Sequence, residues 1–333
     1  MPWPKRRKQK KRRARQKNPK TSSSRSSPPQ LSPPWVELPL EITADILQRV
    51  GVIDILNNAQ RVCSTWWKVC HDPVMWRVID MINDVNSDLR YDLDKIEMCK
   101  VAVDRSQGQL VKINIENIGD IDLFNHIAER SSQLRHLRLV RCHCIIFGCL
   151  AAAAKNFPLL EELHLYFSVI SYNDMEVIGH SCPMLKSFTS NAYGFLGFSP
   201  PRYLCDDQAL AVARSMPELR HLILFGNILT NEGLQAILDG CPHLESLDVR
   251  HCYNLSLEGD LGRRCKQQIV DLKLPHDSTY GYQFDADIFD HSSRGADYSD
   301  QSSDYSVSDD DVHWLSDTSV GHRDHDDHND YYD

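Results

Sequence analysis

A leucine-rich motif recurs at a nearly constant spacing through the middle of the chain. Its copies begin at Leu110, Leu134, Leu160, Leu185, Leu219, Leu244 and Ile269. Neighbouring copies are 24 to 26 residues apart, except for one interval of 34 residues after the fourth copy. A fixed period in this range is typical of a solenoid, in which each repeat packs against its neighbours. The middle of the chain is therefore predicted to be a stack of similar units.

Each copy has the pattern of one strand preceded by one helix. Two apolar residues separated by one position, such as Leu137 and Leu139, point to the same face of a strand. In several copies a proline stands two positions before the first leucine, where it is tolerated because the strand has not yet begun. Helices are predicted at Leu123–Arg130, Leu150–Lys155, Met175–His180, Ala209–Arg214 and Leu234–Leu238. The fourth copy is degenerate, with Ser190 at an apolar position and an insertion after it.

Strand, turn and helix at this period resemble leucine-rich repeats, in particular the cysteine-containing class with a Cys-Pro-x-Leu join. The matching residues are Cys182-Pro183, Cys241-Pro242, Cys142 and Cys252. The resemblance covers residues 105–275 and implies an α/β horseshoe. We predict a helix at Leu93–Val103, within a linker over residues 81–104, that caps the repeat array.

The stretch from Trp35 to Trp76 predicts three short helices. The first has an apolar stripe with helical spacing, formed by Ile42, Ile46, Leu47 and Val50. Gly51 ends it, Asp54 is predicted to cap the second helix, and the third runs from Ala59 towards Pro73. About 40 residues in three helices cannot bury this much apolar surface alone. A downstream domain or a partner is therefore expected to cover the remainder.

This stretch closely resembles the F-box, and we assign residues 35–80 to that module. The resemblance implies docking on the Skp-type adaptor of an SCF ubiquitin ligase. The residues expected to supply the contact are Leu38, Pro39, Ile42, Leu47, Val50, Asp54, Leu56, Val62, Cys63, Trp66 and Trp76. The alternative is that these apolar residues are only the core of a small helical bundle.

The repeat pattern also predicts which strand residues point away from the core. One row contains Arg138, His164, Thr189, Ile223, Asp248 and Lys273, and a second contains Val140, Tyr166, Asn191, Phe225 and Arg250. Tyrosine, phenylalanine and arginine on a concave sheet are typical anchors of a protein interface. We therefore predict a substrate surface formed by Arg138, His164, Tyr166, Phe225, Asp248 and Arg250. The alternative is a solvated sheet face with scattered aromatic residues.

Charge is concentrated at the two ends of the chain. Residues 1–34 contain twelve Lys and Arg and no acidic residue, whereas residues 276–333 contain sixteen Asp and two Arg. Both segments are too polar to bury a core and are predicted to be disordered. The basic run Lys5–Lys17 indicates a nuclear localisation signal, with the cytoplasm as a further location. Nucleic-acid binding is less expected, because no aromatic residues are interleaved to stack on bases, and a solvated basic tail is the other alternative.

No catalytic residue, metal or cofactor is predicted. Cys142, His143, Cys144 and Cys149 lack the paired spacing of a zinc site, and buried free thiols explain them better. The histidines of the acidic tail have no rigid scaffold to hold an ion. The longest apolar run is too short to span a bilayer, and the basic N-terminus lacks the apolar segment of a secretory signal. Eleven cysteines without such a signal indicate reduced thiols in the cytosol or nucleus.

Together the two resemblances imply the substrate-recognition subunit of an SCF-type E3 ubiquitin ligase, similar to plant F-box proteins. Its helical module would bind the Skp-type adaptor, and through it the cullin and the RING protein. Its repeats would bind an unknown target protein, and the subunit would act by proximity without chemistry of its own. Two alternatives are a repeat scaffold that holds the adaptor outside any ligase and a nucleic-acid-associated regulator that uses the basic arm.

Overall fold

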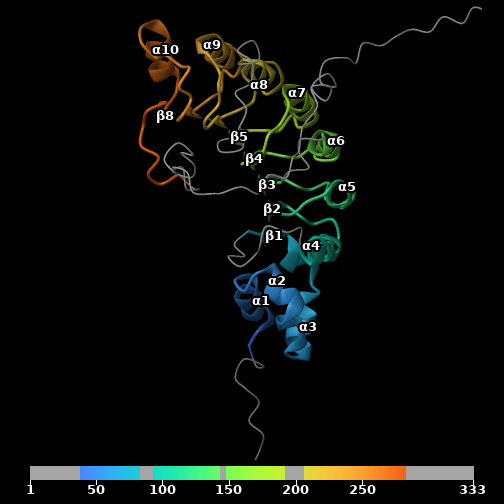
Figure 1. Cartoon of the computed structure of the whole chain (residues 1–333). Helices are drawn as coiled ribbons and strands as arrows, with labels where there is room; N and C mark the ends of the chain where they lie inside the picture. The colour runs from blue at the N-terminus through green and yellow to red at the C-terminus, as the bar shows by residue number, and fades with distance from the viewer. Residues whose placement is uncertain (1–37, 83–92, 143–147, 192–205, 283–333) are drawn as a thin grey trace, which may run out of the picture. The chain divides into compact units, whose positions relative to one another are not determined.

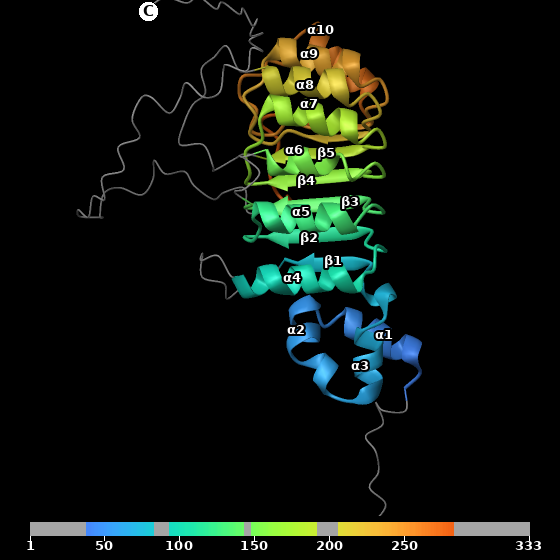
Figure 2. The same ribbon diagram turned by 90° about the vertical axis from the view of Figure 1, so that its right-hand side faces the viewer.

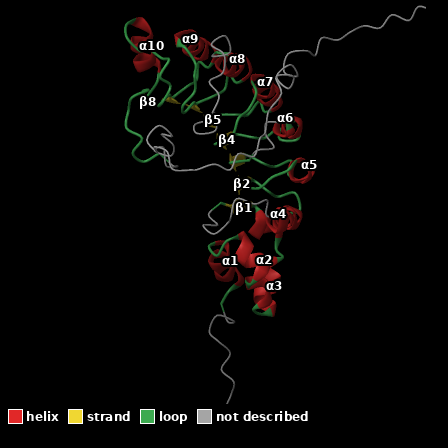
Figure 3. Cartoon of the chain, in the orientation of Figure 1, coloured by secondary structure: helices red, strands yellow, loops and turns green. Residues whose placement is uncertain are grey.

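The computed structural model describes residues 38–82, 93–142, 148–191 and 206–282 (Figure 1). All of them belong to one compact unit of the chain. The predictions made for residues 1–34, for the insertion near 192–203, for His143 and Cys144 and for the tail histidines lie outside the described residues. The predicted fold class, a small all-α module followed by an α/β leucine-rich-repeat solenoid, is confirmed (Figure 3).

The N-terminal module consists of short helices joined by tight turns. Its elements are α1 (Leu40–Gln48), α2 (Val52–Asn57), the 3-10 helix η2 (Ala59–Arg61), α3 (Ser64–Cys70) and the 3-10 helix η3 (Pro73–Trp76). Gly51 has φ +96°, in the left-handed region, and so allows the sharp turn between α1 and α2. The single third helix of our prediction is broken into η2 and α3, because the backbone of Cys63 is extended. The Cys63 sulfur caps α3 by accepting a hydrogen bond from the Trp66 amide.

The predicted capping role of Asp54 is wrong. Asp54 lies inside α2, which begins after Gly51, and its carboxylate accepts a hydrogen bond from the Asn58 side chain at 3.0 Å. The Asp54 carboxylate therefore lies in the first turn of α2. There it interacts favourably with the positive end of the helix dipole, but it does not cap the helix.

Within the described ranges, eight parallel strands form one sheet in which every strand pairs with its neighbours in the sequence (Figure 2). They are β1 (Val78–Met81), β2 (Lys112–Glu116), β3 (His136–Val140), β4 (Glu162–Tyr166), β5 (Ser187–Asn191), β6 (His221–Ile223), β7 (Ser246–Asp248) and β8 (Asp271–Lys273). The paired apolar residues are buried as expected: Leu137 pairs with Leu163, and Leu139 with Leu165. The regular register makes each row of outward-facing residues continuous from strand to strand.

The sheet begins earlier than we predicted. Strand β1 pairs with β2, so the solenoid starts at Val78, inside the range assigned to the helical module and well before residue 105. Ile79 and Met81 alternate inward in the same way as the leucine pairs of later strands. Helix α4 packs against β1 and against the next helix of the array, so this helix belongs to the first repeat.

Seven helices of the described residues cover the other face of the sheet. They are α4 (Leu93–Arg105), α5 (Ile121–Arg130), α6 (Cys149–Ala154), α7 (Tyr172–Ser181), α8 (Asp207–Ser215), α9 (Asn231–Gly240) and α10 (Asp260–Gln268). All of the repeat helices we predicted are present, and α10 is an addition. Side-chain caps move several starts towards the N-terminus: Asp120 accepts a hydrogen bond from the Leu123 amide at 2.7 Å, and Ser171 from the Asp174 amide at 3.0 Å.

The repeat cysteines are buried and hydrogen-bonded to the backbone. The Cys252 thiol donates to the Leu224 carbonyl at 2.8 Å, and the Cys142 thiol to the Ile118 carbonyl at 3.1 Å. Burial raises the pKa of the Cys252 thiol to about 12, so it stays protonated and unreactive. Among the described residues no cluster of His, Cys, Asp and Glu could hold a metal ion.

Arg105 at the end of α4 joins the helical module to the first repeat. Its guanidinium donates to the Cys70 carbonyl at 3.2 Å and to the Gln60 side chain at 2.8 Å. It also lies 5.3 Å from the centre of the Trp76 ring, whose indole N–H donates to the same Cys70 carbonyl at 2.9 Å. The apolar cores of the module and of the solenoid are therefore continuous across this junction.

Candidate interaction surfaces

The helical module leaves many large apolar side chains in solvent. Ile42, Ile46 and Val50 follow one another at intervals of four along α1 and just beyond it, and each is more than 40% exposed. Other exposed apolar residues of the module are Leu40, Val62, Trp67 and Val74. We call these seven residues the exposed apolar set. A row of exposed apolar side chains one helical turn apart, like that of Ile42, Ile46 and Val50, indicates a surface that another protein covers.

The residues predicted to dock an adaptor fall into three groups. Pro39, Ile42, Val50, Asp54 and Val62 are exposed, whereas Leu38, Cys63 and Trp66 are half-buried. Leu47, Leu56 and Trp76 are buried in the core of the module, which corrects the prediction that they contact the adaptor. Helix α1 buries Thr43 and Leu47, which lie four residues apart and face α3, and it leaves Ile42 and Ile46 on the outside.

The strand residues that point away from the helices form a face that we call the concave face (Figure 1). Over β2 to β4 this face carries a polar depression of about 200 Å³. It is lined by Lys112, Asn114, His136, Leu137, Arg138, Glu162, His164 and Tyr166. Of the predicted substrate residues, Arg138 and His164 are partly exposed here, as expected.

Glu162 organises the depression. Its carboxylate lies 2.9 Å from the His136 Nδ1 and 3.6 Å from the His164 Nε2. Although burial opposes ionisation, the hydrogen bond from His136 and the nearby imidazoles hold the pKa of Glu162 below its ordinary value. Burial lowers the pKa of His164, and the Arg138 guanidinium acts in the same direction, with Glu162 opposing both. The lining contains two cationic side chains, Lys112 and Arg138, and one carboxylate, that of Glu162, so the depression suits an anionic or hydrogen-bonding group.

The lowered pKa of His164 predicts a loss of stability in mild acid. Because the unfolded chain takes up a proton at a higher pH than the folded chain, stability falls as the pH drops through about 6.5 towards the folded pKa. We expect His164→Gln to reduce the drop in melting temperature between pH 7.5 and pH 5.5, measured by thermal unfolding at fixed ionic strength. Equal drops in the variant and the parent would contradict this assignment.

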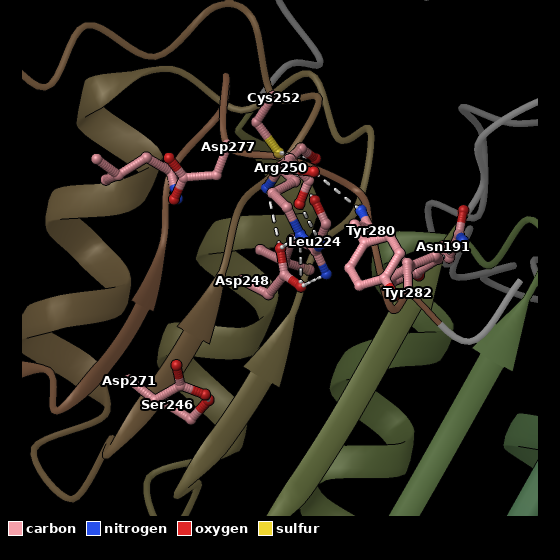
Figure 4. Close-up of polar contacts among 12 residues, drawn as sticks. Asn191, Leu224, Ser246, Asp248, Arg250, Cys252, Asp271, Asp277, Tyr280 and Tyr282 are labelled. Carbon is pink, nitrogen blue, oxygen red and sulfur yellow. Dashed lines mark hydrogen bonds and ion pairs between the residues drawn. The ribbon is translucent and has the colours of Figure 1, made fainter. Parts of the chain in front are cut away.

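The other predicted substrate residues are not exposed, which corrects the prediction. Tyr166, Phe225, Asp248 and Arg250 are each no more than 5% exposed. The cover over the distal repeats comes from residues 274–282, which follow β8 and return across the concave face (Figure 4). Residues 276–282 were predicted to be disordered, and instead they contact the sheet.

Comparisons with known proteins agree with this architecture. A family model described as F-box-like matches residues 35–82, which include the whole helical module and β1. The F-box/LRR-repeat protein 23 of Arabidopsis thaliana is 50% identical over 245 residues, covering 73% of this chain and 54% of the relative. This chain therefore spans about half the length of that relative.

Two further Arabidopsis relatives match over most of their own length. The F-box protein SKIP19 is 46% identical over 264 residues, which cover 78% of this chain and 84% of the relative. The F-box/LRR-repeat protein 21 is 45% identical over 264 residues, covering 75% and 84%. No helix within the four described ranges is long and apolar enough to cross a membrane. The family match and the identities to these relatives show that the chain belongs to the F-box/leucine-rich-repeat proteins of the plant type.

Proposed function

We propose that this protein is the target-recognition subunit of an SCF-type ubiquitin ligase. The observation that carries the proposal is the exposed apolar set, which lies within the segment matched by the F-box-like model. Ile42, Ile46 and Val50 are the residues whose burial by the Skp-type adaptor would contribute most to binding. The adaptor would in turn connect the chain to the cullin and the RING protein.

The repeats are the proposed binding site for the target protein. Parallel strands in register present rows of outward-facing side chains on the concave face, and the depression over β2 to β4 is lined mostly by polar ones. The subunit needs no catalytic group for this role, because holding the target near the charged conjugating enzyme raises its effective concentration. Residence in the nucleus, expected from the basic run Lys5–Lys17, stays a prediction.

The docking proposal is tested by the double substitution Ile42→Asp and Ile46→Asp in the full chain. Two carboxylates at the centre of an apolar contact are expected to weaken binding of a purified Skp-type adaptor about 30-fold, equivalent to about 2 kcal/mol. Isothermal titration calorimetry measures the affinity, and circular dichroism checks the fold. Val101→Asp is the matched control, because Val101 is an exposed valine on α4 outside the module.

Two outcomes would count against the proposal. Adaptor affinity that is unchanged by the double substitution would remove the docking surface. Capture of the adaptor without cullin from cell extract would favour the alternative of a scaffold that acts outside any ligase.

A further inference from the structure

The segment after β8 is held on the concave face by its last described residue. The chain turns after Lys273, and the Leu274 amide donates to the Asp277 carboxylate at 2.7 Å. The Pro275 carbonyl accepts from the His251 amide at 2.9 Å and so extends the ladder beyond the strands. Tyr282 then lies over β5 and the turns that follow β6 and β7 (Figure 4).

Three side chains form a slot around the Tyr282 ring. Phe225 stacks on it with ring centroids 4.2 Å apart and an interplanar angle of 21°. The Arg250 guanidinium lies 5.1 Å from the ring centre, and the Asn191 side chain donates to the phenol oxygen at 2.9 Å. We call Asn191, Phe225 and Arg250 the aromatic slot. It matches the apolar ring, the π face and the polar tip of a tyrosine.

Contacts beneath the slot hold its walls in place. The Arg250 Nε and Nη2 both donate to the Asp248 carboxylate, at 3.0 and 2.6 Å, and both side chains are only 4% exposed. The far side of the Phe225 ring stacks on His251 at 4.8 Å. The slot is therefore preorganised by the repeats themselves, which lowers the cost of binding a side chain there.

The rest of the returning segment is weakly attached. His276, Asp277, Ser278, Tyr280 and Gly281 are exposed, with Tyr280 at 96%. Between Ser278 and Tyr282 the contacts to the sheet are those of the Tyr282 ring and the hydrogen bond from Arg250 to the Ser278 carbonyl at 2.9 Å. A segment with so few buried contacts opens locally at a small free-energy cost compared with unfolding of the strands.

We propose that the aromatic slot is a tyrosine-binding subsite of the target surface, and that Tyr282 fills it in cis until a tyrosine-bearing segment of a target protein displaces it. This inference rests on the proposed function, since it assigns part of the same concave face. A tethered tyrosine has an effective concentration in the millimolar range, so it excludes weak competitors and yields to a target that also uses the neighbouring depression.

The test compares full-length chains that differ at two tyrosines of the same segment. Tyr282→Ala empties the slot, and Tyr280→Ala is the matched control, because Tyr280 is exposed. The probe is a fluorescent synthetic peptide with the sequence of residues 277–283, DSTYGYQ. Fluorescence polarisation is expected to show binding to Tyr282→Ala about tenfold tighter than to the parent or to Tyr280→Ala. A peptide with alanine in place of its second tyrosine is expected to lose that gain.

Hydrogen exchange on the unmodified chain gives a second measurement. The amides of residues 278–282 are expected to exchange by local opening, well before those of β5 to β7. If the amides of residues 278–282 exchange only together with those of β5 to β7, the inference is overturned. A Tyr282→Ala chain that binds the peptide no better than the parent, or that loses the fold of its distal repeats, would overturn it as well. Adaptor affinity, measured in parallel, separates the two proposals. If the unmodified chain does not bind the adaptor, the docking proposal is refuted but the inference about the aromatic slot is unaffected.

Discussion

Trp76→Ala is expected to lower the free energy of unfolding by about 3–5 kcal/mol. Trp76 is 1% exposed, and its indole N–H is hydrogen-bonded to the Cys70 carbonyl. Its ring also supports Arg105, which ties α4 to the helical module. The substitution therefore leaves a cavity where the two cores join, and it frees the Arg105 side chain as well. Denaturant unfolding followed by circular dichroism measures the loss.

Trp67→Ala is the matched control for this prediction. Trp67 lies in the same module but is 52% exposed, and it stacks on His71 at the surface. We expect it to cost less than about 1 kcal/mol, since little apolar area leaves the core. Equal losses for the two tryptophans would mean that Trp76 does not join the module to the repeats.

Local sequence patterns were sufficient for most of the strands and helices of the repeats. Alternation in pairs such as Leu163 and Leu165 identifies inward-facing strand residues without any tertiary knowledge, and the register between copies then follows from the period. Strand β1 was missed because its two inward residues, Ile79 and Met81, lie on either side of the boundary that we placed at residue 80 between the F-box and the linker.

The helical module shows what an apolar stripe cannot distinguish. Ile42 and Leu47 are both apolar and lie on the same short helix, yet one is exposed and the other is completely buried. Core and partner surface require the same residue types, so only the packing of α1 against α3 separates them. The spacing of its apolar residues predicts α1 as a helix, whereas the contact of α1 with α3 determines which face of the helix stays exposed.

The concave face was mispredicted for a different reason. Phe225 and Arg250 do point away from the helices, as the pattern requires, but Tyr282 covers them. Asn191 and Tyr282 are hydrogen-bonded across 91 positions of sequence. The polar composition of the chain after residue 275 predicts disorder, and it carries no signal that one tyrosine fits a preformed slot.

Arg250→Met is expected to destabilise the distal repeats by about 3–5 kcal/mol, because it leaves the Asp248 carboxylate buried without its partner. The double variant Asp248→Leu and Arg250→Met is expected to recover most of that loss, since no uncompensated charge remains. Arg250→Lys keeps the charge but not the two parallel hydrogen bonds, and it is expected to fall in between. A double-mutant cycle measured by denaturant unfolding gives the coupling free energy, and additive losses would contradict the pairing.

The loss from Arg250→Met is expected to stay local. In a stack of repeats each unit is stabilised mainly by its neighbours, so weakening the contacts after β7 frays the end of the array first. Hydrogen exchange should then lose protection in α9 and α10 while α5 and α7 keep theirs. The same variant removes one wall of the aromatic slot, so the peptide of residues 277–283 should no longer bind when Tyr282 is also replaced by alanine. Uniform loss of protection along the whole array would instead show that the Asp248–Arg250 pair stabilises the fold globally.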